Sequence, residues 1–333
     1  MSSTPRFDVL TVGNAIVDVL AHCDDAFLTD NDIIKGAMNL IDAERSAALF
    51  AAMGDARIIS GGSAANTAVG VASMGGRAAY FGKVCDDDNG ALYRRDMQAQ
   101  DVNFETEPLT SAPPTATSMI FVTPDSERSM NTYLGACVEL GPEDIDADLV
   151  AASAVTYFEG YLWDPPRAKD AIRLACDIAH KAGRKTAITL SDTFCIDRYR
   201  EEFKELLSSG AVDIVFANEA EAKALWETDD FDKALDLLAE ASELAVVTRS
   251  ENGSIAISGA DRIVSAAIAP SKLEDTTGAG DLFAAGFLFG LTQGLPLEKC
   301  GQLGNFAASD VISVLGARPL EPLADKAKAA GLL

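Results

Sequence analysis

Short apolar runs alternate with longer helical stretches through the second half of the chain. Strands are predicted at Ala154–Gly160, Lys185–Leu190, Val212–Ala217 and Leu244–Thr248, with Ser254–Ser258 as a hairpin partner. Helices are predicted between and beside them, at 166–182, 198–208, 219–227 and 231–241. Helices of this length between strands indicate an α/β fold, with a doubly wound, mostly parallel sheet flanked by helices.

The first apolar run, Phe7–Gly13, predicts another buried strand. Asn14 and Asp18 follow it with apolar residues between them, which predicts that the strand continues and places both polar side chains at its carboxyl end. Ligands bind at that end of the strands in parallel α/β sheets. The alternative is a turn asparagine and a solvated aspartate.

Two β-like segments, near 15–42 and 105–135, interrupt the alternation. The first has no helix periodicity over residues 22–42 and contains a short strand at 38–42. The second predicts a strand at 115–124 that turns after Pro124 and pairs with a return strand starting at Arg128. Segments of this kind commonly form a lid. We therefore predict one domain over residues 1–333, with a small β lid built from these two insertions.

The composition restricts the partners more than it restricts the fold. The chain has 333 residues, 48% of them hydrophobic, which is enough for one large α/β domain or two ordinary ones. Its net charge of −24 repels nucleic acid and anionic membrane, so neither is expected as a partner. The same charge repels free nucleotide, so any ATP site has to be locally positive or assisted by a metal.

The cysteines and histidines exclude several classes of site. The six cysteines form no C-x-x-C pair and the chain starts without a signal peptide, so we expect reduced thiols and a cytoplasmic location. The two histidines lie in unrelated contexts. A histidine-based zinc site or a Ser-His-Asp triad is therefore not expected.

The most informative stretch is 275–281, a turn of small residues that opens onto an apolar helix. Gly278, Ala279 and Gly280 leave no bulk above their backbone N–H groups, and the first turn of a helix offers such groups without partners. This arrangement favours an anion, above all a phosphate. Asp281 is a poor phosphate ligand but a good proton acceptor, which indicates phosphoryl transfer to a hydroxyl. The alternative is an Asp that only caps the helix.

Two further helix starts carry polar groups. Gly61 and Gly62 lead into a helix of small residues, where backbone can approach a ligand and Asn66 can offer its amide to hydroxyls. Asn218 and Glu221 share one helix face, which suits a metal–water–phosphate network because Mg²⁺ keeps several of its waters. The alternatives are a tightly packed core helix for the first and an ordinary capping box for the second.

These motifs, in this order, resemble the ribokinase-like (PfkB) family of sugar and nucleoside kinases over residues 7–320. The resemblance rests on Gly61-Gly62-Ser-Ala-Ala-Asn66-Thr, on Asn218-Glu-Ala-Glu221 and above all on Asp275-Thr-Thr-Gly-Ala-Gly-Asp281. It implies that Asp281 is the catalytic base and that Gly278, Ala279 and Gly280 form an anion hole. It also implies that Asn218 and Glu221 organise ATP and Mg²⁺, with Glu221 reaching the metal through water.

Within that family, several local stretches are most similar to adenosine kinases. They are Gly13-Asn-Ala-Ile-Val-Asp18, Arg128-Ser-Met-Asn-Thr-Tyr-Leu-Gly-Ala-Cys137 and Gly304-Asn305-Phe-Ala-Ala-Ser. By this resemblance Arg128 lies near the transferring phosphate. The residues implied to contact the substrate are Asn14, Asp18, Gly62, Ser63, Asn66 and Tyr161. Besides the anion hole, those implied to contact ATP are Asn218, Glu221, Thr248, Gly253 and Asn305.

One departure from the adenosine kinase pattern lies in the lid. Met38-Asn39-Leu40 places an Asn near the position where adenosine kinases have an apolar residue against the base. Tyr161 and Trp163 are the predicted aromatic replacement. Some members of the family also bind K⁺ beside the loop at 275, and the residues of that candidate K⁺ site are Asp275 and Thr277.

The leading hypothesis is an ATP-dependent kinase that phosphorylates the primary (5′) hydroxyl of a ribonucleoside, adenosine to AMP, as a monomer or homodimer. A sugar kinase acting on ribose, fructose or a relative is the first alternative, and a non-catalytic nucleotide-binding regulator is the second. A NAD-dependent Rossmann enzyme is disfavoured because the turn at 278–283 lacks the third glycine of G-x-G-x-x-G. The P-loop pattern G-x-x-x-x-G-K-[ST] does not occur either.

Overall fold

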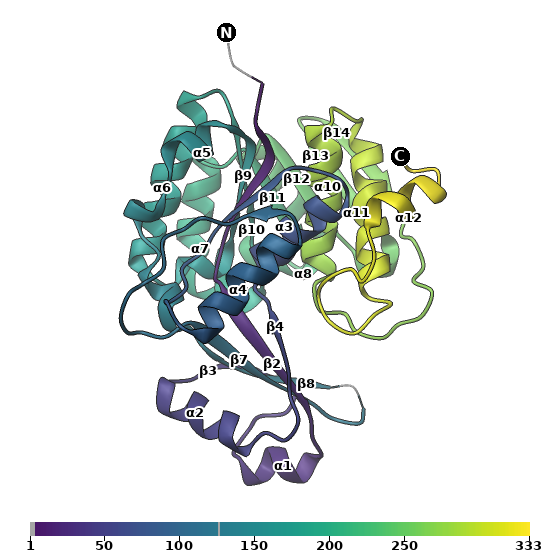
Figure 1. Cartoon of the computed structure of the whole chain (residues 1–333). Helices are drawn as coiled ribbons and strands as arrows, with labels where there is room; N and C mark the ends of the chain where they lie inside the picture. Colours follow the sequence, from purple (N-terminus) through teal and green to yellow (C-terminus); the bar gives the residue numbers. More distant parts are fainter. Residues whose placement is uncertain (1–3, 126) are drawn as a thin grey trace.

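The computed structural model describes residues 4–125 and 127–333, and its main feature is a nine-stranded sheet (Figure 1). In spatial order the strands are β14 Asp261–Ser265, β13 Ser254–Ser258, β12 Leu244–Thr248, β11 Ile214–Asn218, β10 Lys185–Thr189, β9 Ser153–Glu159, β1 Phe7–Val12, β5 Ala78–Phe81 and β6 Val102–Asn103. The strands from β6 to β12 pair in parallel, and β13 and β14 are antiparallel. The predicted doubly wound, mostly parallel sheet is confirmed.

Helices cover both faces of this sheet. One layer holds α3 Ser63–Ser73, α4 Asp88–Ala99, α10 Ala279–Thr292, α11 Leu297–Val311 and α12 Leu323–Ala329, and the other holds α5 Ala147–Ala151, α6 Pro166–Lys181, α7 Thr193–Ser208, α8 Glu219–Leu225 and α9 Phe231–Ala241. Side chains alternate along each strand, so Val9 packs into the first layer and Leu10 into the second. Burial on both faces explains the continuous apolar runs of these strands. Within the described ranges, no helix has the length and hydrophobicity needed to cross a bilayer.

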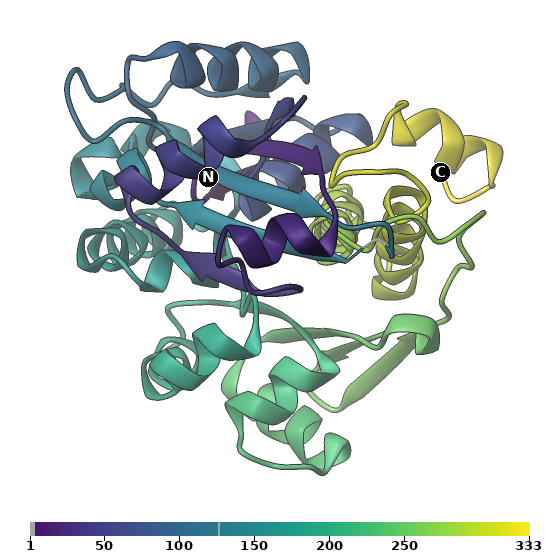
Figure 2. The ribbon, with the colours of Figure 1, turned by 90° about the horizontal axis from the view of Figure 1, so that it is seen from below.

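A second, five-stranded sheet lies below the large one in Figure 1. Its order is β3 Met38–Leu40, β8 Arg128–Tyr133, β7 Ala116–Val122, β2 Ile16–His22 and β4 Arg57–Ser60. Two helices, α1 Asp25–Asp30 and α2 Ala43–Ala52, pack on its outer side; Figure 2 shows α1 across the strands. Four of its five strands fall in the two predicted insertions and β4 lies outside them. Its role as a lid stays a prediction.

The chain passes from the large sheet to the small one directly after β1. The two strands β1 and β2 belong to different sheets, so the prediction of a single strand running to Asp18 is wrong. Gly13 permits the crossing, because a Cβ at this position would lie 2.3 Å from Oε2 of Glu159. As a result Asn14 stays at the carboxyl end of β1, whereas Asp18 lies inside β2.

Two helices differ from the sequence prediction. Helix α1 lies within the segment that showed no helix periodicity, because six residues are too few to display the repeat. Its cap is Asp24, whose carboxylate accepts from the Phe27 amide at 2.8 Å. Helix α7 begins before the predicted start at 198, since Asp192 caps it and non-helical backbone at Tyr199 interrupts the apolar pattern. Short 3-10 helices occupy Gly135–Glu139 (η1), Pro142–Asp144 (η2), Gly160–Trp163 (η3) and Ser250–Asn252 (η4).

Helices α3 and α10 pack closely because a glycine lies at their contact. A Cβ on Gly70 of α3 would lie 2.5 Å from Cβ of Ala285 and 2.7 Å from Cδ1 of Leu282, both in α10. All three residues are buried. This contact sets the distance between the two helices and therefore between the polar residues at their N-termini.

We expect Gly70→Val to lower the free energy of unfolding by about 1–3 kcal/mol, because the added methyl groups overpack the contact between α3 and α10. Gly54→Val is the matched control, since nothing lies within 4 Å of an added Cβ there. Urea denaturation of both variants measures the difference. Equal stability would show that the two helices separate without cost.

Candidate active site

A cavity of about 360 Å³ lies between the small sheet and the N-terminal ends of α3 and α10. Its wall includes four of the residues predicted to form the site, Asp18, Asn66, Arg128 and Thr277. The remaining wall comes from Leu20 of β2, from β4, from the end of α4 and from the irregular segment 315–320. The fold therefore brings motifs from distant parts of the chain to one place.

Asp281 lies in the first turn of α10 and is held there by α3. Its Oδ1 accepts from the Ser63 hydroxyl at 2.6 Å, and its Oδ2 accepts from the Asn66 side-chain amide at 3.0 Å. The Thr67 hydroxyl also donates to the backbone carbonyl of Asp281 at 3.2 Å. Burial raises the pKa of Asp281, while these two side-chain hydrogen bonds and the charge of Arg318 lower it. The carboxylate is thus fixed in orientation and remains a proton acceptor.

The glycines of the same turn have separate tasks. Gly278 caps α10 in the left-handed conformation (φ 78°), and a Cβ on it would lie 2.8 Å from Ala317. At Gly280 nothing lies within 4 Å of an added Cβ, so the space above this residue is open. Within the described residues, the backbone amides of Gly280 and Asp281 have no hydrogen-bond acceptor. The turn of the predicted anion hole therefore has two donors without partners, and the space above Gly280 is open.

Asp18 lies on the small sheet at the opposite wall of the cavity. Its carboxylate approaches the chain at Gly61, where a Cβ would lie 2.2 Å from Oδ2. The next residue, Gly62, has φ 95° and would bring a Cβ to 2.2 Å from the carbonyl oxygen of Asn14. The double glycine is required by these two approaches. Burial raises the pKa of Asp18 to about 7, although Arg318 and Arg128 lower it.

Asn14 is oriented by a carboxylate that the sequence analysis did not single out. Its backbone N–H and side-chain amide donate to Oε1 of Glu159 at 2.9 and 2.7 Å, and the Ala64 N–H donates to Oε2 at 2.8 Å. Glu159 is buried, which raises its pKa to about 7. Among the described residues, the buried Oδ1 of Asn14 has no partner. The sequence signal was the position of Glu159 at the carboxyl end of a predicted parallel strand.

Arg128 pairs with Asp275 between β8 and the turn before α10. Oδ1 of Asp275 also accepts from the Thr277 N–H at 3.0 Å and the Thr277 hydroxyl at 2.7 Å, and Oδ2 accepts from the Gly316 N–H at 2.7 Å. Four donors therefore surround this carboxylate. The ion pair ties the small sheet to the loop that carries the anion hole.

Asn218 and Glu221 form the capping box that was the alternative to a metal-binding pair. Oε1 of Glu221 accepts from the Asn218 side-chain amide at 2.6 Å, and Oε2 accepts from the Asn218 N–H at 3.0 Å. Oδ1 of Asn218 in turn accepts from the Glu221 N–H at 2.8 Å. Burial raises the pKa of Glu221 to about 7, and the negative charge of Asp192 adds to the effect.

The other predicted ATP-side residues lie on neighbouring elements. Thr248 of β12 pairs with Asn218 on one side and with Ser254 on the other. Gly253 has φ 78°, and a Cβ on it would lie 2.1 Å from the carbonyl oxygen of Ser265. The close approach of these two chain segments therefore needs a glycine. The Asn305 amide donates to Ser254, Ser265 and Ala266 at 3.2, 3.1 and 3.0 Å. Through these contacts Asn305 joins α11 to β13 and to the end of β14.

The two residues of the predicted aromatic wall, Tyr161 and Trp163, lie in different surroundings, and the substrate contact of Tyr161 stays a prediction. Tyr161 is half-buried in η3, where burial and the charges of Asp192 and Asp281 raise its pKa. Trp163 is fully buried in the opposite helix layer, with its ring 5.4 Å from that of Phe203 and its N–H donated to Glu202. The prediction for Trp163 is therefore wrong, because η3 turns this side chain away from the cavity.

The strand register also corrects the expectation for the lid. Leu40 pairs with Thr132, Thr132 with Ser118, and Ser118 with Asp18, so these four side chains share the cavity face of the small sheet. Asn39 points to the opposite face, beside α2. The apolar residue Leu40, and not Asn39, thus faces the cavity side of the small sheet.

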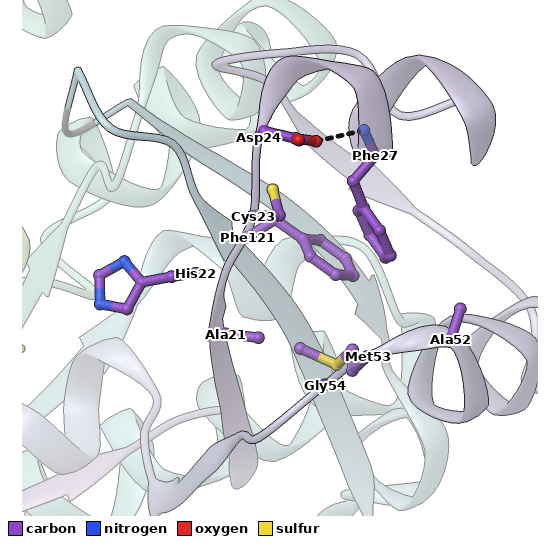
Figure 3. Close-up of a pocket in the computed structure, with 9 residues that line it drawn as sticks. All are labelled: Ala21, His22, Cys23, Asp24, Phe27, Ala52, Met53, Gly54 and Phe121. Carbon is purple, nitrogen blue, oxygen red and sulfur yellow. Dashed lines mark hydrogen bonds between the residues drawn. The ribbon is translucent and has the colours of Figure 1, made fainter.

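A second cavity, of about 290 Å³, lies at the far end of the small sheet (Figure 3). The rings of Phe27 and Phe121 form part of its wall, with centroids 5.1 Å apart, and Cys23 and Met53 add sulfur atoms. No residue of the predicted site lines it. It is separate from the cavity that contains Asp18.

Comparisons with known proteins find relatives that are named as kinases. A model of the pfkB family of carbohydrate kinases matches residues 36–323. The solved adenosine kinase of Sinorhizobium meliloti is 64% identical, with a TM-score of 0.92, over 98% of this chain and 99% of that one. A probable sugar kinase of Rhizobium etli CFN 42 is 59% identical, with a TM-score of 0.94, over 99% and 100%. Adenosine kinase 2 of Arabidopsis thaliana is 27% identical over 95% of this chain and 97% of its own length.

Glu159→Ala should lower the free energy of unfolding by at least about 3 kcal/mol, because each buried donor left without an acceptor costs about 1–3 kcal/mol. Glu159→Gln keeps the shape and one acceptor oxygen, so its loss should be smaller. The exposed Glu205 gives the control variant Glu205→Ala. Chemical denaturation measures all three, and equal stabilities would contradict the role of Glu159 as the acceptor for Asn14 and Ala64.

The pH dependence gives a second check on Glu159. Its pKa is about 7 in the folded protein, above the ordinary value of 4.5, so the folded state binds the extra proton between these values. Raising the pH through this window ionises the buried carboxyl and lowers stability. This component of the pH dependence should be absent from Glu159→Gln.

Proposed function

The chain belongs to the pfkB family of carbohydrate kinases, and from this premise we propose that it transfers the γ-phosphoryl group of ATP to the 5′ hydroxyl of adenosine, giving AMP and ADP. As a member of this family it is an ATP-dependent kinase with an alcohol group as acceptor, which sets aside a non-catalytic regulator. The assignment to adenosine is supported by the 64% identity to the adenosine kinase of Sinorhizobium meliloti.

The observation that carries the proposal is the position of Asp281. Ser63 and Asn66 hold its carboxylate in place at the start of α10, beside two free backbone amides, and Asn66 also lines the cavity. In the proposed reaction the hydroxyl proton passes to Asp281 while the hydroxyl oxygen forms a bond to the γ-phosphorus. The bond from that phosphorus to the oxygen of ADP breaks, and the electron pair leaves with ADP.

Charge on the transferring group is balanced by donors of this chain. The amides of Gly280 and Asp281 lie at the helix N-terminus, where they attract negative charge, and Gly278 and Ala279 shape the turn that exposes them. Arg128 lines the same cavity, and we assign it to the phosphoryl group in transit. Because Arg128 is already paired with Asp275, its guanidinium is held in place before any substrate arrives.

The residues assigned to the ATP site fit Mg²⁺ only if they contact it through water molecules. Among the described residues no group of three acidic, histidine or cysteine side chains could enclose a metal. Glu221, with Asp192 beside it, offers carboxylate oxygens that suit a metal keeping its own waters. Bound Mg²⁺ would neutralise phosphate charge. We assign Glu221 to its water shell and Asn218, Thr248, Gly253 and Asn305 to the walls of the ATP site.

Asp275 does not fit a potassium site through its side chain. Its two oxygens already accept from Thr277, Gly316 and Arg128. A carboxylate offers about four acceptor positions, and four donors use them. The hydroxyl of Thr277 likewise donates its hydrogen bond to Asp275. Only backbone carbonyls would remain as K⁺ ligands, and we derive no step from K⁺.

The opposite wall suits a nucleoside. We assign Asp18, Gly62 and Asn66 to the ribose hydroxyls, and the unpartnered Oδ1 of Asn14 is the acceptor that we assign to one of them. The cavity face of the small sheet adds apolar side chains for a flat base, namely Leu20, Met38, Leu40 and Ile59. Tyr161 is assigned to the same substrate.

A sugar kinase is the second candidate. The 59% identity to a probable sugar kinase of Rhizobium etli CFN 42 favours it, and the same base and anion hole would serve ribose or fructose. The two candidates differ in the apolar face around Leu40, which a base would cover and a sugar would leave exposed to water.

Asp281→Asn should reduce kcat at least about 100-fold, because it removes the base while keeping the shape of the side chain. Calorimetry should still detect binding of ATP and adenosine. Asp148→Asn is the control, an exposed aspartate in the first turn of another helix. A rate for Asp281→Asn close to that of the unmodified protein would rule out Asp281 as the base.

Turnover of adenosine, ribose and fructose with ATP separates the two candidates. We expect kcat/KM for adenosine to exceed the sugar values by at least about 100-fold, because burying a base adds more apolar contact than a sugar provides. Leu40→Asp should then raise KM for adenosine and leave KM for ATP unchanged. Ribose or fructose turning over faster than adenosine would overturn the proposed substrate and leave the role of Asp281 intact.

A further inference from the structure

Arg318 lies at the centre of the cavity wall, in the irregular segment after α11. Its Nε donates to Oδ1 of Asn66 at 3.0 Å and its Nη1 donates to the Ser60 hydroxyl at 2.6 Å, while Nη2 lies 3.8 Å from Sδ of Met97. The side chain is half-buried. None of the sequence motifs includes it, and the reaction described above does not use it.

The hydrogen bonds of Arg318 determine which way the Asn66 amide faces. A guanidinium can only donate and a carboxylate can only accept. Asn66 lies between the two, so its Oδ1 has to face Arg318 and its Nδ2 has to face Asp281. With the amide turned over, oxygen would meet the Asp281 carboxylate and both hydrogen bonds would be lost. Arg318 therefore excludes the wrong orientation.

The charge of Arg318 acts on the same carboxylate. The groups that face Asp281 are Ser63 and Asn66 from α3, Tyr157 and Glu159 from β9, Tyr161 from η3 and Arg318 from the 315–320 segment. Burial raises the pKa of Asp281, and Arg318 opposes this shift. The positive charge thus favours the ionised form of Asp281, which is the form that accepts a proton.

We propose that Arg318 is a positioning residue for phosphoryl transfer, which acts through Asn66 to align the Asp281 carboxylate and through its charge to keep that carboxylate ionised. The inference rests on the proposed role of Asp281 as the base. It does not depend on whether the hydroxyl belongs to a nucleoside or to a sugar.

The first test is the pH profile of kcat for Arg318→Met at saturating ATP and adenosine. Saturation is required because the charge of Arg318 also lowers the pKa of Asp18, which is assigned to substrate binding, whereas kcat reports the groups that titrate in the complex with bound substrate. Loss of the positive charge raises the pKa of Asp281, so the acidic limb should move to higher pH by about one unit. At the pH optimum kcat should fall about tenfold, because Asp281 loses its alignment.

Arg318→Lys separates charge from geometry. Lysine keeps the positive charge, so the acidic limb should return close to its original pH. It cannot reproduce the two-armed contact with Asn66 and Ser60, so kcat at the optimum should recover only in part. An acidic limb displaced as far in Arg318→Lys as in Arg318→Met would overturn the electrostatic half of the proposal.

A double-mutant cycle with Asn66→Ala tests the path through Asn66. If Arg318 acts through Asn66, adding Arg318→Met to Asn66→Ala should leave kcat at the optimum within about twofold. Losses that multiply would overturn the positioning role. Arg262→Met, which removes a surface arginine paired with Asp232 and Asp236, is the matched control.

Thermal melting of each variant establishes whether it is folded, and if Arg318→Met is not, Arg318→Gln replaces it as the uncharged variant. The two proposals fail separately. Normal activity of Asp281→Asn would refute the base. An inactive Asp281→Asn together with an unshifted, fully active Arg318→Met would refute only the role of Arg318. If adenosine is not turned over, the same profiles are measured with ribose.

Discussion

The hydrogen bonds from Ser63 and Asn66 to the carboxylate of Asp281 join the N-termini of α3 and α10, which lie more than 200 positions apart in the chain. The rest of the site depends on this junction. Gly70 lets the two helices pack closely enough for the bonds to form. Gly62 lets α3 start beside the backbone carbonyl of Asn14, which lies 2.2 Å from where a Cβ on Gly62 would be. A free carboxylate at a helix N-terminus would face solvent, whereas this one is held by two side chains of α3.

Burial lowers the negative charge of several carboxylates assigned to the site, which bears on how an acidic protein can hold anionic ATP. The pKa values of Asp18, Glu159 and Glu221 are all raised to about 7 by burial, so these three side chains carry less negative charge at neutral pH than the sequence suggests. Arg128 and Arg318 enter the cavity wall from different elements. The local balance of charge thus differs from the net charge of −24.

The sequence was informative where backbone chemistry leaves a local signature. The turn at 278–280, the double glycine at 61–62 and the pair Asn218 and Glu221 all stand at helix starts, and all lie where the fold class predicts ligand-binding loops. The capping box of Asn218 and Glu221 is compatible with both interpretations of that pair.

The residues that the sequence did not reveal act through contacts between distant segments. Glu159 follows an apolar strand and looks like any polar strand end, yet it orients Asn14. Arg318 lies in a segment without periodicity, and its partner Asn66 is 252 positions away. The strand break after Gly13 and the inward side of Leu40 also depend on sheet pairing, which a local pattern does not specify.

The crossing of the chain between the two sheets has one further consequence. Asn14 is bonded to Glu159 of the large sheet, whereas Asp18 belongs to the small sheet, and both are assigned to the same substrate. Any rotation of one sheet against the other would change the separation of these two ligands. Substrate affinity would then depend on the angle between the sheets, since only three residues of backbone separate Asn14 from Asp18.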